Sequence, residues 1–367
     1  MSPVPKPRSD RRAGALDALR FFAAAFIVLY HFGPNAPMDL ASTAGIFSRG
    51  WLATDFFLVL SGYILGRAYG QALDEGRLRF SAFFARRISR VWPAQLIMLV
   101  SLAALVVLAG LIGAAPGSPE RFQWGDFFAQ AALIHAWGVT HQAGWNEPSW
   151  TLSALIVCYA AFPLLWVASR PLAGRISALV AGLGLLTTAA ALSITLLDHS
   201  LFDLPFHQGV MRALPLFAFG TLLARFAGGQ ALGRAASAAT AVTAACTLAV
   251  IQAAPVSDLS AWLSVVAIAA IVISAEGLRI RSRPWLKWAA DMSFALFITH
   301  ALVGAAWFGL EEQLGLTASW PAWAGGVLAA LIFASLFHRF VDEPIQERIR
   351  AALSRPRPQA TPDGRLA

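Results

Sequence analysis

The sequence predicts an all-α fold: a polytopic integral membrane helical bundle with about ten transmembrane helices. Hydrophobic residues make up 57% of the 367 residues and charged residues only 13%, whereas about a quarter of the residues of a soluble domain are charged. Apolar stretches of about twenty residues, long enough to cross a bilayer as helices, follow one another along the chain.

Each expected span is delimited by polar or helix-breaking residues. The first runs on to Gly33 and Pro34 without a convincing cleavage site, so we interpret it as an uncleaved span and not as a signal peptide. The second opens at Gly50, the third follows an Arg cluster, and the fourth opens at Pro148. Arginines separate the later spans, and Pro344 follows the last. The expected spans are residues 15–33, 51–69, 91–113, 148–169, 175–197, 208–227, 232–253, 259–276, 287–309 and 321–341.

Basic residues fall almost entirely on one side of this arrangement. They precede the first span, separate the second from the third, and return after every even span and in the C-terminal segment. The positive-inside rule therefore predicts that both termini are cytoplasmic, in a multi-pass protein of a bacterial cytoplasmic (inner) membrane. The net charge of +8 reflects this topology, so we expect membrane lipids as partners and no nucleic acid.

The chain divides into three predicted parts. Residues 1–14 form a disordered cytoplasmic N-terminus, residues 15–345 the transmembrane domain, and residues 346–367 a cytoplasmic basic tail. Cys158 and Cys246 lie in predicted helices with no metal-ligand spacing, so we expect neither a disulfide framework nor a metal.

Arg20 and His31 lie within the first span, where an ionisable side chain is costly. Eleven residues of helix separate them by about 16 Å along the axis and by roughly 20° around it. One helix face therefore presents a cation near the inner surface and an imidazole near the outer one. Snorkelling of Arg20 and simple helix packing by His31 are the alternatives.

Asp55 opens the second span at a depth similar to that of His31. A carboxylate beside an imidazole fixes its tautomer and stabilises its charged form, as a general base requires. We predict His31 and Asp55 as catalytic residues, although a carboxylate at a helix start is also favoured by the helix dipole alone.

Three arginines, Arg86, Arg87 and Arg90, stand within five residues at the inner mouth of the third span. Topogenic charge or anionic-lipid binding explains them as well as a ligand does. If Arg20 belongs to the same site, the guanidinium groups match the phosphates of a cofactor.

These motifs together resemble acyltransferase family 3, the membrane-bound O-acyltransferases of bacterial surface polysaccharides. The resemblance covers roughly residues 14 to 345 and departs where Ala154 follows Ser153 in place of an acidic residue. About 25 residues remain after the last span, so we expect a stand-alone core without a fused SGNH domain. The segments that resemble the family are Arg20 and His31 with ten residues between them, residues 55–62, residues 86–90 before Pro93, residues 150–153, and residues 293–300.

The resemblance implies transfer of an acyl group, most simply acetyl, from cytoplasmic acyl-CoA to a hydroxyl of an extracytoplasmic glycan or glycolipid such as exopolysaccharide or O-antigen. Acetyl-CoA would be a donor substrate and no cofactor would be bound permanently. Arg20, Arg86, Arg87 and Arg90 would bind the CoA phosphates. The acceptor would enter from outside beside Trp145, Trp150, Ser153 and His300, the second intramembrane histidine.

A proton-coupled membrane transporter or exporter is the alternative. Buried Arg and His in a Gly- and Ala-rich bundle suit a carrier as well. Against it, the sequence shows no paired interrupted helices in matching halves, and acidic residues are scarce within the spans.

Overall fold

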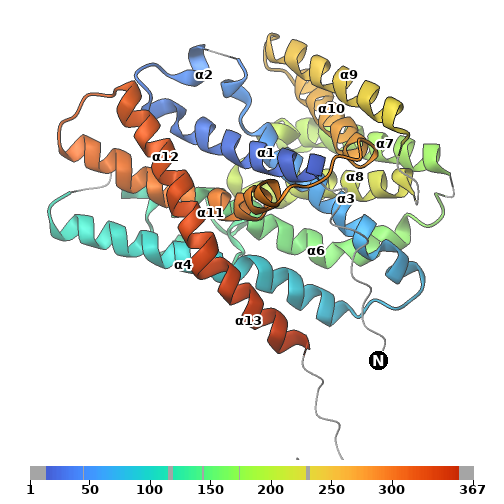
Figure 1. Cartoon of the computed structure of the whole chain (residues 1–367), viewed down its shortest axis with the longest axis horizontal. Helices are drawn as coiled ribbons and strands as arrows, with labels where there is room; N and C mark the ends of the chain where they lie inside the picture. Colours follow the sequence, from blue (N-terminus) through green and yellow to red (C-terminus); the bar gives the residue numbers. More distant parts are fainter. Residues whose placement is uncertain are drawn as a thin grey trace, which may run out of the picture.

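The computed structural model describes residues 14–43, 45–114, 119–142, 144–172, 174–228 and 232–354, which form helices and no strand (Figure 1). The basic N-terminus up to residue 13 and the tail from residue 355 lie outside these ranges. The helices are α1 Gly14–Phe32, α2 Leu40–Thr43, α3 Leu52–Asp74, α4 Phe80–Leu111, α5 Trp124–Ala131, α6 Trp150–Ala168, α7 Arg175–Leu197, α8 Gly209–Ala227, α9 Arg234–Gln252, α10 Asp258–Gly277, α11 Pro284–Gln313, α12 Trp320–Phe337 and α13 Glu343–Ser354. Short helical turns connect them at Gly33–Asn35, Phe47–Arg49, Pro119–Arg121, His135–Val139, Glu147–Ser149, Leu201–Asp203, Phe206–Gln208 and His338–Asp342.

The polytopic all-α bundle expected from the sequence is confirmed: within the described ranges, 9 helical segments are long and apolar enough to cross a membrane. They are α1, α4 and α6 to α12, which coincide with nine of the expected spans. The remaining expected span forms α3, which does not meet this standard. Because α3 packs against α1, α6, α8 and α10, protein and not lipid surrounds much of it, and its surface tolerates polar residues.

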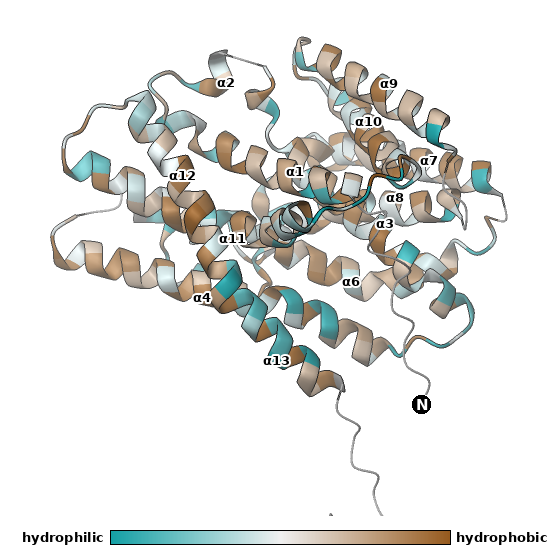
Figure 2. Cartoon of the chain, viewed as in Figure 1, coloured by the Kyte–Doolittle hydropathy of each residue, from teal (hydrophilic) through white to brown (hydrophobic). Residues whose placement is uncertain are grey.

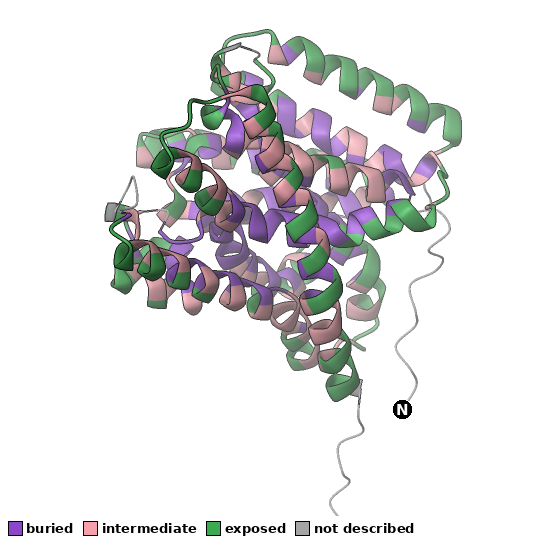
Figure 3. Ribbon diagram, turned by 60° about the vertical axis from the view of Figure 1, so that its left-hand side comes forward, coloured by how far each residue is buried: buried purple, intermediate pink, exposed green. Residues whose placement is uncertain are grey.

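Two apolar cores hold the bundle together. One is built around α3, α6, α8 and α10, and the other joins α1, α4, α11 and α12. Buried residues gather at the centre of the molecule and exposed residues at its rim (Figure 3). Hydrophilic residues concentrate on α13, which continues from the C-terminal end of α12 through the turn His338–Asp342 (Figure 2).

Helices α3 and α8 touch backbone to backbone through two glycines. A Cβ atom on Gly62 would lie 2.0 Å from the Phe217 carbonyl oxygen, and one on Gly220 would lie 2.0 Å from the Val59 carbonyl oxygen. Only glycine fits at both positions, since no side-chain rotation can relieve a clash with backbone atoms. Small residues that permit such close approach are typical of helix contacts in membranes.

We expect Gly62→Ala to destabilise the protein by about 1–3 kcal/mol, because the added methyl group must push α8 away from α3. Thermal unfolding of the purified protein in detergent measures this loss. Gly184→Ala on α7 is the matched control, since its Cβ would meet nothing within 4 Å. Equal unfolding temperatures for the two variants would contradict the close contact.

Candidate active site

His31, at the C-terminal end of α1, lies against His300 in the middle of α11. The Nδ1 atom of His31 is 3.3 Å from Nε2 of His300, and the two rings meet edge to face with centroids 5.0 Å apart. Helices α1 and α11 run side by side over most of their length, which brings together two residues that are 269 positions apart. His300 is 0% exposed, whereas His31 is partly exposed.

The hydrogen bonds of His300 determine where the protons of this pair reside. Its Nδ1 atom lies 2.9 Å from the Phe297 carbonyl oxygen and 3.3 Å from that of Leu296. Because a carbonyl only accepts, Nδ1 of His300 carries the proton and its Nε2 must accept. His31 therefore donates from Nδ1, and its own Nε2 holds an unshared electron pair. Nε2 of His31 bonds to no residue in the described part of the chain.

Asp55, which we expected beside His31, is instead paired with Arg212 of α8. Nε and Nη2 of Arg212 both donate to Oδ1 of Asp55, at 3.0 Å and 2.8 Å. The two side chains are 0% and 6% exposed, and the guanidinium lies over the rings of Trp51 and Trp150, 5.4 Å and 5.7 Å from their centroids. The expected contact does not form because Arg212 is the stronger partner for a buried carboxylate, and His300 takes the place beside the imidazole.

Arg212 was not identified from the sequence. It is a charged residue within the expected span 208–227, and such a residue in an apolar span is a sign of a buried partner. An ion pair between Arg121 and Glu147, 3.0 Å apart, was missed as well. Arg121 lies within electrostatic range of His31, and Glu147 lies within electrostatic range of His300. Both charges therefore act on the histidine pair.

The other residues assigned to the acceptor hold the outer loop in place. Ser153 donates to the Leu133 carbonyl oxygen and accepts from the Ala136 amide, at 2.9 Å and 3.1 Å. Trp145 is buried and donates to the carbonyl oxygen of Gln123 at 2.8 Å. Trp150 packs on Arg212, as described above. The hydrogen bonds of Ser153 and Trp145 are thus used within the protein, so any contribution to acceptor binding is indirect.

The loop before α6 also contains a buried imidazole. Nε2 of His135 lies 3.2 Å from the Ser149 hydroxyl, and burial lowers the pKa of His135 to about 4. This residue is therefore neutral at physiological pH. Among the described residues, no group of three His, Cys, Asp or Glu side chains is placed to hold a metal ion.

On the opposite side of the bundle, the arginines of α4 differ in how far they are already neutralised. Arg90 binds both carboxylate oxygens of Asp342, at 2.8 Å and 3.1 Å, and lies over the ring of Phe294. Arg87 donates to the hydroxyl of Tyr69, and the buried Nε atoms of Arg86 and Arg87 donate to no residue of the described chain. These two guanidinium groups have unused hydrogen-bond donors, whereas the charge of Arg90 is balanced.

Arg20 of α1 is within electrostatic range of Arg90 and of two carboxylates, Asp17 and Asp291. Its role in binding a cofactor stays a prediction.

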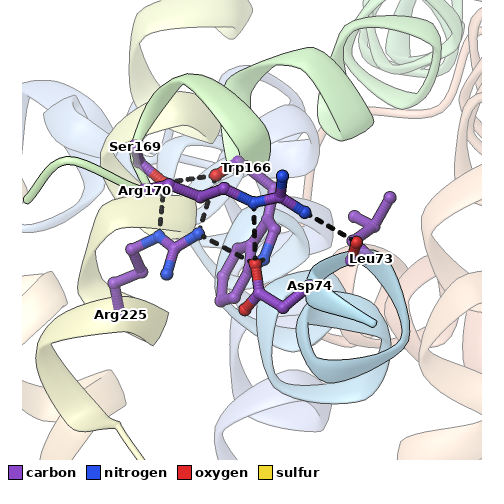
Figure 4. A network of polar contacts seen from close by, with 6 residues as sticks. All are labelled: Leu73, Asp74, Trp166, Ser169, Arg170 and Arg225. Atoms are coloured by element: carbon purple, nitrogen blue, oxygen red, sulfur yellow. Dashed lines mark hydrogen bonds and ion pairs between the residues drawn. The ribbon is translucent and has the colours of Figure 1, made fainter. Parts of the chain in front are cut away.

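A second group of arginines differs from Arg86 and Arg87 because it is paired with a carboxylate. Oδ1 of Asp74 accepts from Arg170 and Trp166 at 3.2 Å and 3.1 Å and pairs with Arg225 at 3.5 Å (Figure 4). Arg225 also donates to the Trp166 carbonyl oxygen and lies over the Trp166 ring. This network ties α3, α6 and α8 together, and its two arginines share the single carboxylate of Asp74, so one positive charge remains. Arg86 and Arg87 lack such a carboxylate partner in the described chain.

Comparison with known proteins gives the following similarities. A family described as an acyltransferase domain matches residues 14–339. The chain is 28% identical over 383 residues to "Acyltransferase MdmB" of Streptomyces mycarofaciens, covering 95% of both chains. It is 36% identical over 107 residues to "Putative peptidoglycan O-acetyltransferase YrhL" of Bacillus subtilis, covering 28% of this chain and 15% of that protein. It is 35% identical over 98 residues to "Protein 2 in picA locus" of Rhizobium radiobacter, covering 27% of this chain and 48% of that protein. No solved structure matches.

Proposed function

We propose a specific reaction for this chain, which belongs to the acyltransferase family that matches residues 14–339. It transfers an acyl group, most simply acetyl, from cytoplasmic acyl-CoA to a hydroxyl of a glycan or glycolipid on the outer side of the membrane. The observation that carries the proposal is the His31–His300 pair, which leaves Nε2 of His31 as an unprotonated, accessible base. The name of the Bacillus relative, a peptidoglycan O-acetyltransferase, supports a glycan acceptor.

In this reaction Nε2 of His31 removes the proton of the acceptor hydroxyl as that oxygen attacks the thioester carbonyl carbon. The carbon–sulfur bond then breaks, and the CoA thiolate takes a proton from the imidazolium. His300 is a positioning residue: it keeps Nδ1 of His31 protonated, so that only Nε2 faces the reactants. If the reaction runs in two steps, the same nitrogen carries the acyl group before the acceptor takes it.

Arg20, Arg86 and Arg87 would bind the phosphates of CoA. Arg86 and Arg87 have unused donors, and Arg20 faces the cluster from α1. Guanidinium groups suit phosphate because their N–H groups match its oxygen atoms. Arg90, paired with Asp342, would hold α4 against the end of α12 and contribute to the positive field.

This mechanism requires the donor and the acceptor to approach from opposite sides. The arginines of α4 lie on the Lys- and Arg-rich side, and His31 lies eleven residues beyond Arg20 toward the other side. We therefore place both termini in the cytoplasm and the chain in a bacterial inner membrane. A hydrophilic CoA molecule cannot cross hydrocarbon, so the acyl group must pass between helices.

Oriented membrane vesicles test this placement. We expect acetyl-CoA to be consumed only from the cytoplasmic face and the acetylated glycan to appear only on the other face. In a Cys246→Ala background, Thr317→Cys should react with an impermeant thiol reagent from outside and Ser81→Cys should not, since both positions are exposed but lie on opposite sides. Labelling of Ser81→Cys from outside, or product on the cytoplasmic face, would contradict the proposal.

A further inference from the structure

Two side-chain amides are buried together beside the histidine pair. Gln95 of α4 is 0% exposed, and Asn146, at the end of the outer loop, is 2% exposed. Nδ2 of Asn146 donates to Oε1 of Gln95 at 2.9 Å and to the Ile298 carbonyl oxygen at 3.5 Å. Ile298 lies two residues before His300 on α11, about 3 Å along the helix axis.

Each of these amides has one atom without a partner among the described residues. Because the Ile298 carbonyl oxygen can only accept, the nitrogen of Asn146 must face it, which leaves Oδ1 unpaired. Gln95 uses its oxygen to accept from Asn146, which leaves its Nε2 unpaired. Two neighbouring amides thus leave one buried donor and one buried acceptor unsatisfied, which is costly.

We infer that Gln95 and Asn146 form a recognition site for a secondary amide group of a substrate. The amide carbonyl would accept from Nε2 of Gln95, and the amide N–H would donate to Oδ1 of Asn146. A secondary amide offers one acceptor and one donor, the two functions that Nε2 of Gln95 and Oδ1 of Asn146 lack. This inference rests on the proposed function. Two substrates carry a secondary amide: CoA, in its pantetheine arm, and an amino-sugar acceptor, in its N-acyl group.

The position of the site suits a substrate group that lies beside the reacting atoms. In pantetheine the nearest amide is two methylene groups from the sulfur, and in an N-acyl amino sugar it is attached directly to the ring. The third amide of the network, Gln130, accepts from the backbone N–H of Asn146 at 2.9 Å and so holds that residue in place.

Binding measurements on the purified full chain test the inference. The probes are CoA, adenosine 3′,5′-bisphosphate, which lacks the pantetheine arm, octyl N-acetylglucosaminide and octyl glucoside. We expect Gln95→Met to weaken the binding of either CoA or octyl N-acetylglucosaminide about tenfold. The binding of the corresponding probe without the amide, adenosine 3′,5′-bisphosphate or octyl glucoside, should not change. Weaker binding of CoA identifies the donor as the source of the amide, and weaker binding of the N-acetyl glycoside identifies the acceptor as its source. Ser264→Ala should leave both preferences intact, because it removes a buried hydrogen bond to the Ser260 carbonyl oxygen on α10, outside this network.

The wild-type chain provides a second readout that needs no variant. It should bind CoA more tightly than an analogue in which ester oxygens replace the amide nitrogens, or bind the N-acetyl glycoside more tightly than octyl glucoside. Equal affinities in both comparisons would overturn the inference and would indicate that a buried water satisfies the two atoms. The proposed function is tested separately, since it would be contradicted if the protein released no CoA from acetyl-CoA in the presence of glycans. The binding measurements do not depend on that result.

Discussion

His31→Ala is expected to reduce acetyl transfer by about 10²- to 10⁴-fold, the usual contribution of a positioned general base. The cause is the loss of Nε2, the atom of the histidine pair that faces the reactants. Release of CoA from acetyl-CoA in detergent-solubilised protein measures the effect, and the unfolding temperature shows that the protein remains folded. His141→Ala, at an exposed position of the outer loop, is the control and should retain full activity. Turnover of His31→Ala within a few-fold of wild type would refute the assignment.

His300 provides the companion test of how the pair works. Glutamine at this position can still accept from Nδ1 of His31 while donating to the backbone, so His300→Gln should retain more activity than His300→Leu. We expect losses of about tenfold and about 100-fold respectively, because leucine leaves the tautomer of His31 unspecified. The pH dependence of the rate should change with leucine and much less with glutamine. Equal losses and unchanged pH profiles would reduce His300 to a packing role.

Asp55→Asn is expected to destabilise the folded protein by about 3–5 kcal/mol, because it leaves the guanidinium of Arg212 buried without a countercharge. Arg212→Met should have a cost of similar size, since it strands the carboxylate. Replacing both residues with apolar ones, Asp55→Leu with Arg212→Met, should restore much of the stability, since no isolated charge remains.

Unfolding in detergent of the wild type, Asp55→Leu, Arg212→Met and the double variant forms a double-mutant cycle that measures this coupling. Residual transfer activity of folded Asp55→Asn protein separates the two roles considered for this carboxylate. If Asp55→Asn unfolds like wild type yet transfers no acetyl group, Asp55 acts in catalysis and the ion pair is not its main role.

Much of the bundle could be predicted from the sequence because the bilayer dictates it. Apolar runs of about twenty residues bounded by arginines led to α1, α4 and α6 to α12 with shifts of only a few residues at most ends. Periodicity along a single helix also led to the spacing of Arg20 and His31 on α1. These are properties of local sequence, and they require no knowledge of which helices become neighbours.

The partners of the site residues could not be predicted in the same way. His31 pairs with His300 and Asp55 with Arg212, across 269 and 157 residues of sequence. The sequence predicts a similar depth in the membrane for His31 and Asp55, but at one depth several helices compete to be neighbours. Which of them meet depends on packing between helices, including the glycine contact of α3 with α8 that fixes the position of Arg212 relative to Asp55.

The hydrogen bond from His300 to the Phe297 carbonyl oxygen has a consequence for bioenergetics. A proton wire requires each group to pass its proton onward, but a peptide carbonyl of the same helical turn cannot take one up. The pair therefore offers no onward path through His300, and a proton taken up at Nε2 of His31 is given up again from Nε2. The proposed transfer would therefore be driven by the thioester of acyl-CoA and not by a proton relayed across the bilayer through this pair.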